Sequence, residues 1–228
     1  DKCKIKKGSI KTIYFLGNSH TDHLRETHYK ISNKLNISID GNTVSNCVFP
    51  PDPDEEKCGD IQSILQERLL NKTRSGDIIV ISNRYDTEEP KDYKWLTDKE
   101  STERLNDFAK KIALKGGKIV LFEPTPEFQL SIHNCKEEWF RTLTNKNCNI
   151  REKVFRKERE HIYNLLDQLP ENIILYDPLK AICFNGECSM TDKLGRPLYK
   201  DKDHFTDFAN SMYIYEDFLR FLKDKKLI

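Results

Sequence analysis

The chain has 228 residues, which suits one α/β domain with its own hydrophobic core, and its 38 basic and 37 acidic residues leave a net charge of +1. This balance excludes a nucleic-acid-binding protein that depends on a global basic field, and no apolar run approaches the ~20 residues needed to span a bilayer. No signal peptide is recognisable and residues 1–10 resemble a linker. We therefore expect a mature chain or an excised soluble domain.

Short apolar runs bounded by turn residues alternate with longer segments whose apolar residues recur at helical spacing. This alternation predicts a three-layer α/β/α sandwich with a mostly parallel central sheet, formed by a single domain over residues 1–228. Ligands of such sheets bind beyond the carboxyl ends of the strands. We expect strands at 12–16, 36–39, 78–81, 118–122 and 172–176. Between and after them we expect helices at 21–35, from Asp60 to Leu69, around 105–112, at 151–169 and at 206–222. The second of these helices would be capped by Asp60 and would have Ile61, Ile64, Leu65 and Leu69 as its apolar stripe.

The cysteines indicate the redox compartment. No C-x-x-C pair is present, so the common zinc patterns are excluded. Six of the seven cysteines form three pairs that lie close in sequence within loops, which favours disulfides and an oxidising compartment over free thiols in a cytosolic protein. Cys3 is left over, either free or paired outside this segment. The expected disulfides are Cys47–Cys58, Cys135–Cys148 and Cys183–Cys188.

A candidate nucleophile follows the first strand, where four apolar residues lead directly into Gly17-Asn18-Ser19-His20. A strand, a tight turn, a serine and a helix expose a hydroxyl at the carboxyl edge of a sheet, and the start of the helix offers N–H groups to an oxyanion. Such turns also occur without chemistry, so Ser19 needs a base and an orienting group elsewhere in the chain.

The candidate base is His204, in the loop before the last predicted helix. Asp201 lies three residues earlier, a spacing at which side chains in a turn come together, whereas the neighbouring Asp203 is expected to point away. His20 and His23 are too close in sequence to reach the Ser19 hydroxyl easily from the opposite side. The alternative for His204 is a surface histidine at a helix N-terminus.

Taken together, these segments resemble the SGNH (GDSL-like) hydrolase superfamily, which implies a flavodoxin-like sandwich. The closer resemblance is to the SGNH domain fused to membrane acyltransferase-3 proteins, which O-acetylate bacterial surface polysaccharides. The resemblance spans essentially the whole chain. It is carried by Gly-Asn-Ser-His at 17–20, Asn-Cys-Val-Phe-Pro at 46–50, Ile-Ser-Asn-Arg-Tyr at 81–85, and the stretch from Cys183 to Ala209 that holds Asp201-x-x-His204.

The resemblance implies a role for each site residue. Ser19 would accept the acyl group, His204 would act as general base and then general acid, and Asp201 would fix the imidazole tautomer. The Ser19 N–H would form part of the oxyanion hole. The further candidates for oxyanion or substrate binding are Asn46, Asn83 and Arg84, and Asn18 stands where the superfamily usually has Asp.

The resemblance also implies a function. We expect an extracytoplasmic O-acyltransferase (acetyltransferase) that acylates polysaccharide or oligosaccharide hydroxyls without metal or cofactor. It would be a soluble domain excised from a larger membrane-anchored protein and tethered at the periplasmic face of the bacterial inner membrane. The oligomeric state is left open, with a monomer favoured. A membrane acyltransferase-3 domain would deliver the acyl donor, and the loops at 84–98 and 127–150 would line the acceptor side. The alternatives are a carbohydrate O-acetyl esterase with the same mechanism and a catalytically weak glycan-binding or partner-docking domain. An intracellular lipase or esterase is less favoured because of the paired cysteines.

Overall fold

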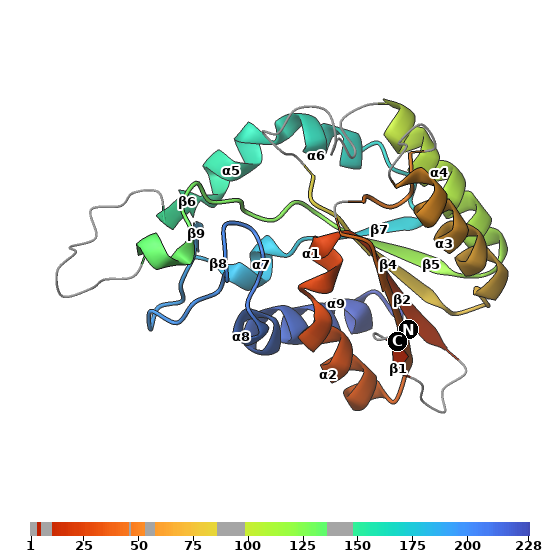
Figure 1. Cartoon of the computed structure of the whole chain (residues 1–228), viewed down its shortest axis with the longest axis horizontal. Coiled ribbons are helices and arrows are strands. Elements are labelled where there is room, and N and C mark those ends of the chain that lie inside the picture. The colour runs from red at the N-terminus through yellow and green to blue at the C-terminus, as the bar shows by residue number, and fades with distance from the viewer. Residues whose placement is uncertain (1–3, 6–10, 46, 53–57, 86–98, 136–147) are drawn as a thin grey trace.

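The computed structural model describes residues 4–5, 11–45, 47–52, 58–85, 99–135 and 148–228. Within these residues a six-stranded sheet has the order β1-β3-β2-β4-β5-β7, parallel except for β1 at one edge (Figure 1). The parallel strands follow the doubly wound order of flavodoxin-like folds, in which the chain reverses direction across the sheet between β2 and β4. The strands are β1 (Lys4–Ile5), β2 (Thr12–Gly17), β3 (Ser38–Thr43), β4 (Ile78–Ser82), β5 (Lys118–Phe122) and β7 (Ile173–Tyr176).

Helices cover both faces of this sheet, as the sequence predicts (Figure 1). Successive residues of a strand point to opposite faces, so Ile13 and Phe15 of β2 join one core while Tyr14 and Leu16 join the other. The first core is completed by α2 (Arg25–Leu35) and α9 (Tyr215–Asp224), and the second by α3 (Gly59–Lys72), α4 (Lys99–Leu114) and α6 (Glu160–Leu166).

A second, smaller sheet lies to one side of the main one. It joins β6 (Asn149–Arg151), β9 (Glu187–Ser189) and β8 (Cys183–Phe184) in antiparallel order. The short helices η1 (Ile132–Cys135), α5 (Glu152–Glu158) and α7 (Leu179–Ile182) accompany it. The disulfides Cys47–Cys58, Cys135–Cys148 and Cys183–Cys188 are present, in the predicted pairing.

Three predicted helices are divided in the structure. The first splits into α1 (Ser19–Asp22) and α2, because the His23 carbonyl accepts a hydrogen bond from the Asn210 side chain instead of continuing the helix. The helix predicted at 151–169 breaks at Arg159, which lets Phe155 pack in one core and Ile162 in the other. The last one consists of α8 (Asp207–Ala209), a π-helical turn η3 (Asn210–Ile214) and α9.

Two expectations about α3 need correction. The apolar stripe assigned to α3 is wrong for Ile61 and Ile64, which are exposed, because the buried Gln62 faces the preceding loop and donates to the Cys47 carbonyl at 3.0 Å. The N-cap of α3 is Cys58 rather than Asp60. Of the linker-like residues 1–10, Lys4–Ile5 form an edge strand on β3. None of the helices in the described ranges combines the length and hydrophobicity that a membrane crossing requires.

Candidate active site

Ser19 lies at the reversal point of the sheet, directly beyond the carboxyl end of β2. Gly17 is level with Ser82 of β4 and has φ +138°, and a side chain there would collide with the Ser82 carbonyl. The buried Thr21 hydroxyl lies 2.7 Å from the Leu16 carbonyl oxygen and 2.6 Å from that of Ser82. These contacts hold the turn tightly between the two strands and fix the start of α1 at Ser19.

Asn18 joins this turn to the segment that follows β4. Its side-chain oxygen accepts hydrogen bonds from the backbone N–H of His20 at 3.0 Å and of Arg84 at 3.2 Å. A carboxylate could accept the same two bonds, so Asn18 keeps the acceptor function of the usual Asp while removing its charge.

The structure brings Ser19, His204 and Asp201 together in the order that a nucleophile, a base and an orienting group require. His204 Nε2 lies 2.8 Å from Ser19 Oγ, and His204 Nδ1 lies 2.9 Å from Asp201 Oδ2. Asp201 Oδ1 also accepts from the backbone N–H of His204 at 2.8 Å and of Asp203 at 3.1 Å. The carboxylate therefore closes the loop and orients the ring at the same time.

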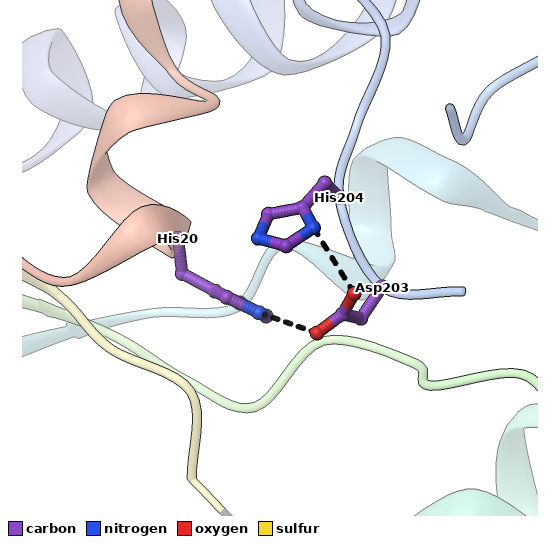
Figure 2. A group of neighbouring side chains, drawn as sticks. All are labelled: His20, Asp203 and His204. Carbon is purple, nitrogen blue, oxygen red and sulfur yellow. Dashed lines mark hydrogen bonds and ion pairs between the residues drawn. The ribbon is translucent and has the colours of Figure 1, made fainter. Parts of the chain in front are cut away.

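The prediction that Asp203 points away from His204 is wrong. Asp203 Oδ1 lies 3.1 Å from His204 Nδ1, while its Oδ2 lies 3.2 Å from Nε2 of the buried His20. Figure 2 shows this carboxylate between the two imidazoles, with one oxygen toward each ring. Arg84 Nε lies 3.3 Å from Asp203 Oδ2, and the Arg84 guanidinium also donates to Glu127 at 2.7 Å. Two carboxylates thus contact Nδ1 of one histidine.

The protonation of the site follows from these contacts. Burial alone would lower the pKa of His204, but hydrogen bonds and charge from Asp201 and Asp203 outweigh it and raise this pKa from 6.5 to about 9. The pKa values of Asp201 and Asp203 lie below the ordinary value despite burial, because His204 bonds to Asp201, and His20 and His204 both bond to Asp203. Burial and the neighbouring His20 and His204 lower the pKa of His23, whose neutral Nδ1 accepts from the Phe205 N–H at 3.3 Å.

The sequence matches the family described as the SGNH domain (fused to AT3 domains) over residues 1–215. The chain belongs to this family. Membership supports an enzyme of acyl-transfer or hydrolase type, and the paired Ser19 and His204 provide the chemistry that such an enzyme needs. No curated protein matches the chain by sequence.

Solved structures confirm the fold of this SGNH domain. The periplasmic domain of a lipopolysaccharide acetyltransferase from Salmonella ser. Paratyphi A aligns with a TM-score of 0.68 and 16% identity over 98% of this chain and 86% of its own. Protein YXIM from Bacillus subtilis aligns with a TM-score of 0.58 and 16% identity, over 96% of this chain and 57% of its own. A predicted acylhydrolase from Bacteroides fragilis aligns with a TM-score of 0.52 and 13% identity, over 97% of this chain and 90% of its own.

Of the three side chains predicted for the oxyanion hole, the structure describes the contacts of Asn83 and Arg84. The buried Asn83 side chain clamps the backbone of Phe49, accepting from its N–H at 3.2 Å and donating to its carbonyl at 2.7 Å. One of the two amide hydrogens of Asn83 remains for another acceptor. The Arg84 guanidinium contacts two carboxylates, and Asn46 lies outside the described residues. The oxyanion roles of these residues and of the Ser19 N–H stay predictions.

Among the described residues, His20, Asp203 and His204 form the one group whose ligand-type atoms gather closely enough to hold a metal ion, within 4.8 Å of one another. Both oxygens of Asp203 already face an imidazole nitrogen, and the Arg84 guanidinium already places a positive charge beside one of them. Because Asp203 already has these partners, we interpret the group as an ion-pair network and do not assign it as a metal site.

The network around Asp203 was not predicted from the sequence. His20 contacts Asp203 across 183 residues of chain, and its Nδ1 lies 3.4 Å from the Thr125 hydroxyl beyond β5. Glu127 enters through its pairing with Arg84. The sequence did contain a signal for these contacts, because His20 directly follows the candidate nucleophile Ser19 and Asp203 directly precedes the candidate base His204.

Proposed function

We propose that this domain transfers an acyl group to a carbohydrate hydroxyl through an acyl-serine formed on Ser19. The observation that carries the proposal is the 2.8 Å contact between Ser19 Oγ and His204 Nε2, with Nδ1 of the same ring on Asp201. A serine hydroxyl becomes a useful nucleophile only when a neighbouring base removes its proton, and this geometry supplies that base.

The chemistry proceeds in two halves. Ser19 Oγ attacks the acyl carbonyl carbon while its proton passes to His204 Nε2, and the departing alcohol oxygen takes that proton when its bond to the carbonyl breaks. The acceptor hydroxyl then gives its proton to His204, attacks the acyl-serine and releases Ser19, which regains the proton. Asp201 stabilises the imidazolium that forms in each half.

Three disulfides support an extracytoplasmic location, because such bonds persist in oxidising compartments. The family consists of SGNH domains fused to AT3 domains, which supports a membrane acyltransferase domain as the source of the acyl group. The structural likeness to a lipopolysaccharide acetyltransferase periplasmic domain supports a bacterial surface glycan as acceptor.

The experiment is to treat the purified domain with a fluorophosphonate probe and to follow p-nitrophenyl acetate turnover. Stoichiometric labelling and turnover are expected for the wild type and for Ser75→Ala, which replaces an exposed serine far from the site. Ser19→Ala should lose both. Equal turnover in Ser19→Ala and the wild type would overturn the proposal, and a wild type that neither labels nor turns over would favour a non-catalytic glycan-binding domain.

A carbohydrate O-acetyl esterase is the second candidate, since water and a sugar hydroxyl can attack the same acyl-serine. The two are separated by adding oligosaccharide acceptors to the acyl-enzyme and analysing the products by mass spectrometry. Acylated sugar is expected for a transferase. Free acid at an unchanged rate, with no acylated sugar from any acceptor of a bacterial surface-glycan panel, would point to the esterase.

A further inference from the structure

The two carboxylates beside His204 Nδ1 differ in their surroundings. The Asp201 side chain is 46% exposed, whereas that of Asp203 is 10% exposed. Asp201 receives its other hydrogen bonds from the backbone of its own loop. Asp203 is instead held by His20 from α1 and by Arg84 from the segment after β4. The buried carboxylate is therefore anchored to the main sheet, and the exposed one to its own turn.

This difference decides which carboxylate acts more strongly on His204 at equal distance. A charge interaction weakens as the surrounding dielectric constant rises, so a buried carboxylate acts more strongly than one that is half exposed. An isolated buried carboxylate would take up a proton, but His20 and Arg84 favour the ionised form of Asp203. The network thus keeps a permanent negative charge 3.1 Å from Nδ1.

We propose that Asp203 is a second positioning residue for His204. Asp203 and Asp201 together stabilise the imidazolium, and His20 and Arg84 hold Asp203 in place and in its charged form. The inference rests on the proposed function, because this positioning matters for chemistry only if His204 exchanges protons with Ser19. Asp201 orients the ring through its own loop, and Asp203 ties the same ring to the nucleophile's helix through His20 (Figure 2).

Charged and titratable groups surround His204 from several elements, and each contributes to its protonation. Asp201 and Asp203 favour the imidazolium, and Arg84 opposes it by its position beside Asp203. Glu127 partly neutralises Arg84. Among the described residues, these groups are Lys200, Asp201 and Asp203 in the loop of His204, His20 in α1, His23 directly after α1, Arg84 after β4, and Glu127 after β5.

Two substitutions with opposite expected signs test the proposal. Asp203→Asn removes a negative charge beside Nδ1, so the pH midpoint of kcat/KM for p-nitrophenyl acetate should fall by about one unit or more. Arg84→Gln removes the opposing positive charge, while His20 still holds Asp203 in its ionised form, so the midpoint should rise. Asp207→Asn is the matched control, because it removes an exposed carboxylate from the following helix, and the midpoint should stay in place. General damage to the fold would not move the midpoint in opposite directions.

The pKa of His204 is also measured directly, by NMR titration of its imidazole nitrogens in Ser19→Ala with and without Asp203→Asn. This readout needs no turnover, so it tests the inference even if the proposed function fails. A lower His204 pKa without Asp203 is expected. Unchanged titration in Asp203→Asn would overturn the inference, while fluorophosphonate labelling of the wild type would leave the proposed function standing. If Asp203→Asn does not fold, the pH midpoint of Arg84→Gln serves as the test. A higher midpoint than in the wild type is expected, and an unchanged midpoint would overturn the inference.

A double substitution measures how the two carboxylates share the task. If both stabilise the same imidazolium, Asp201→Asn keeps part of the activity because Asp203 remains, and adding Asp203→Asn then costs more than it does in the wild type. Equal fold-losses of kcat/KM in both backgrounds would mean that the carboxylates act independently, and would overturn the shared role.

Discussion

His204 Nε2 lies 2.8 Å from Ser19 Oγ, although 185 residues of chain separate them. The contact forms because Ser19 follows β2 at the reversal point of the sheet, and because the loop of His204 runs across the same edge before α8. It places a base of raised pKa beside a hydroxyl at the N-terminus of α1.

Activity should depend on pH through His204. The base must be neutral to accept the Ser19 proton, and its pKa of about 9 means that it is mostly protonated at pH 7. The rate of p-nitrophenyl acetate turnover should therefore rise with pH and level off above pH 9, after subtraction of the Ser19→Ala rate at each pH. A profile that is already level at pH 7 would contradict the raised pKa.

The same shift affects stability. His204 has a higher pKa in the folded state than its ordinary value of 6.5, so its contribution is fully present below pH 6.5 and is lost as the pH rises through about 9. The lowered pKa values of Asp201 and Asp203 contribute stability above pH ~4 that is lost on acidification. Denaturant unfolding at pH 6 and pH 10 should show a smaller difference in His204→Gln than in the wild type.

Gly17→Ala should destabilise the protein by about 3 kcal/mol or more, because the residue has φ +138° and the new Cβ would strike the Ser82 carbonyl. Gly186→Ala is the matched control, since Gly186 also has positive φ (+77°) but a Cβ added there would meet nothing within 4 Å. That variant should lose about 1 kcal/mol. Urea unfolding measures both, and equal losses would show that the close approach to β4 is unimportant.

Asn83→Ala should lower stability by about 2–4 kcal/mol, because it leaves the buried N–H and carbonyl of Phe49 without their partner. If the remaining amide hydrogen of Asn83 serves the oxyanion, kcat should also fall by about 10²–10³-fold at a temperature where the variant is folded. Asn42→Ala, at a partly buried strand position, is the control. Lost stability with normal kcat would restrict Asn83 to holding the 47–50 segment.

The Cys47–Cys58 disulfide should stabilise the domain more than Cys183–Cys188. The sequence separations of 11 and 5 residues correspond to losses of about 3 and about 2 kcal/mol when each pair is replaced by alanines. Removal of Cys47–Cys58 should also slow fluorophosphonate labelling, because that bond closes the segment that Asn83 clamps. An unchanged labelling rate would show that the 47–50 segment does not contribute to the reactivity of Ser19.

The sequence predicted the α/β sandwich, the three cysteine pairs, and the residues that meet at Ser19. Most of these inferences depended on local patterns: apolar runs that end in turns, cysteines close in sequence, and an Asp three residues before a His. The pairing of His204 with Ser19, 185 residues apart, came instead from the resemblance to the SGNH superfamily. Where contacts are local, residue types and spacing are sufficient, because the backbone geometry of a turn or strand leaves few alternatives.

Only the tertiary structure decided which groups share the His204 imidazole. Adjacent residues usually point apart, yet Asp201 and Asp203 both reach Nδ1, because the loop bends around the ring and His20 and Arg84 attract the second carboxylate. The breaks in the helices and the exposed face of α3 were decided in the same way, by packing against segments distant in sequence. Spacing along the chain does not encode such contacts, since their energy comes from groups that meet only after the sheet has formed.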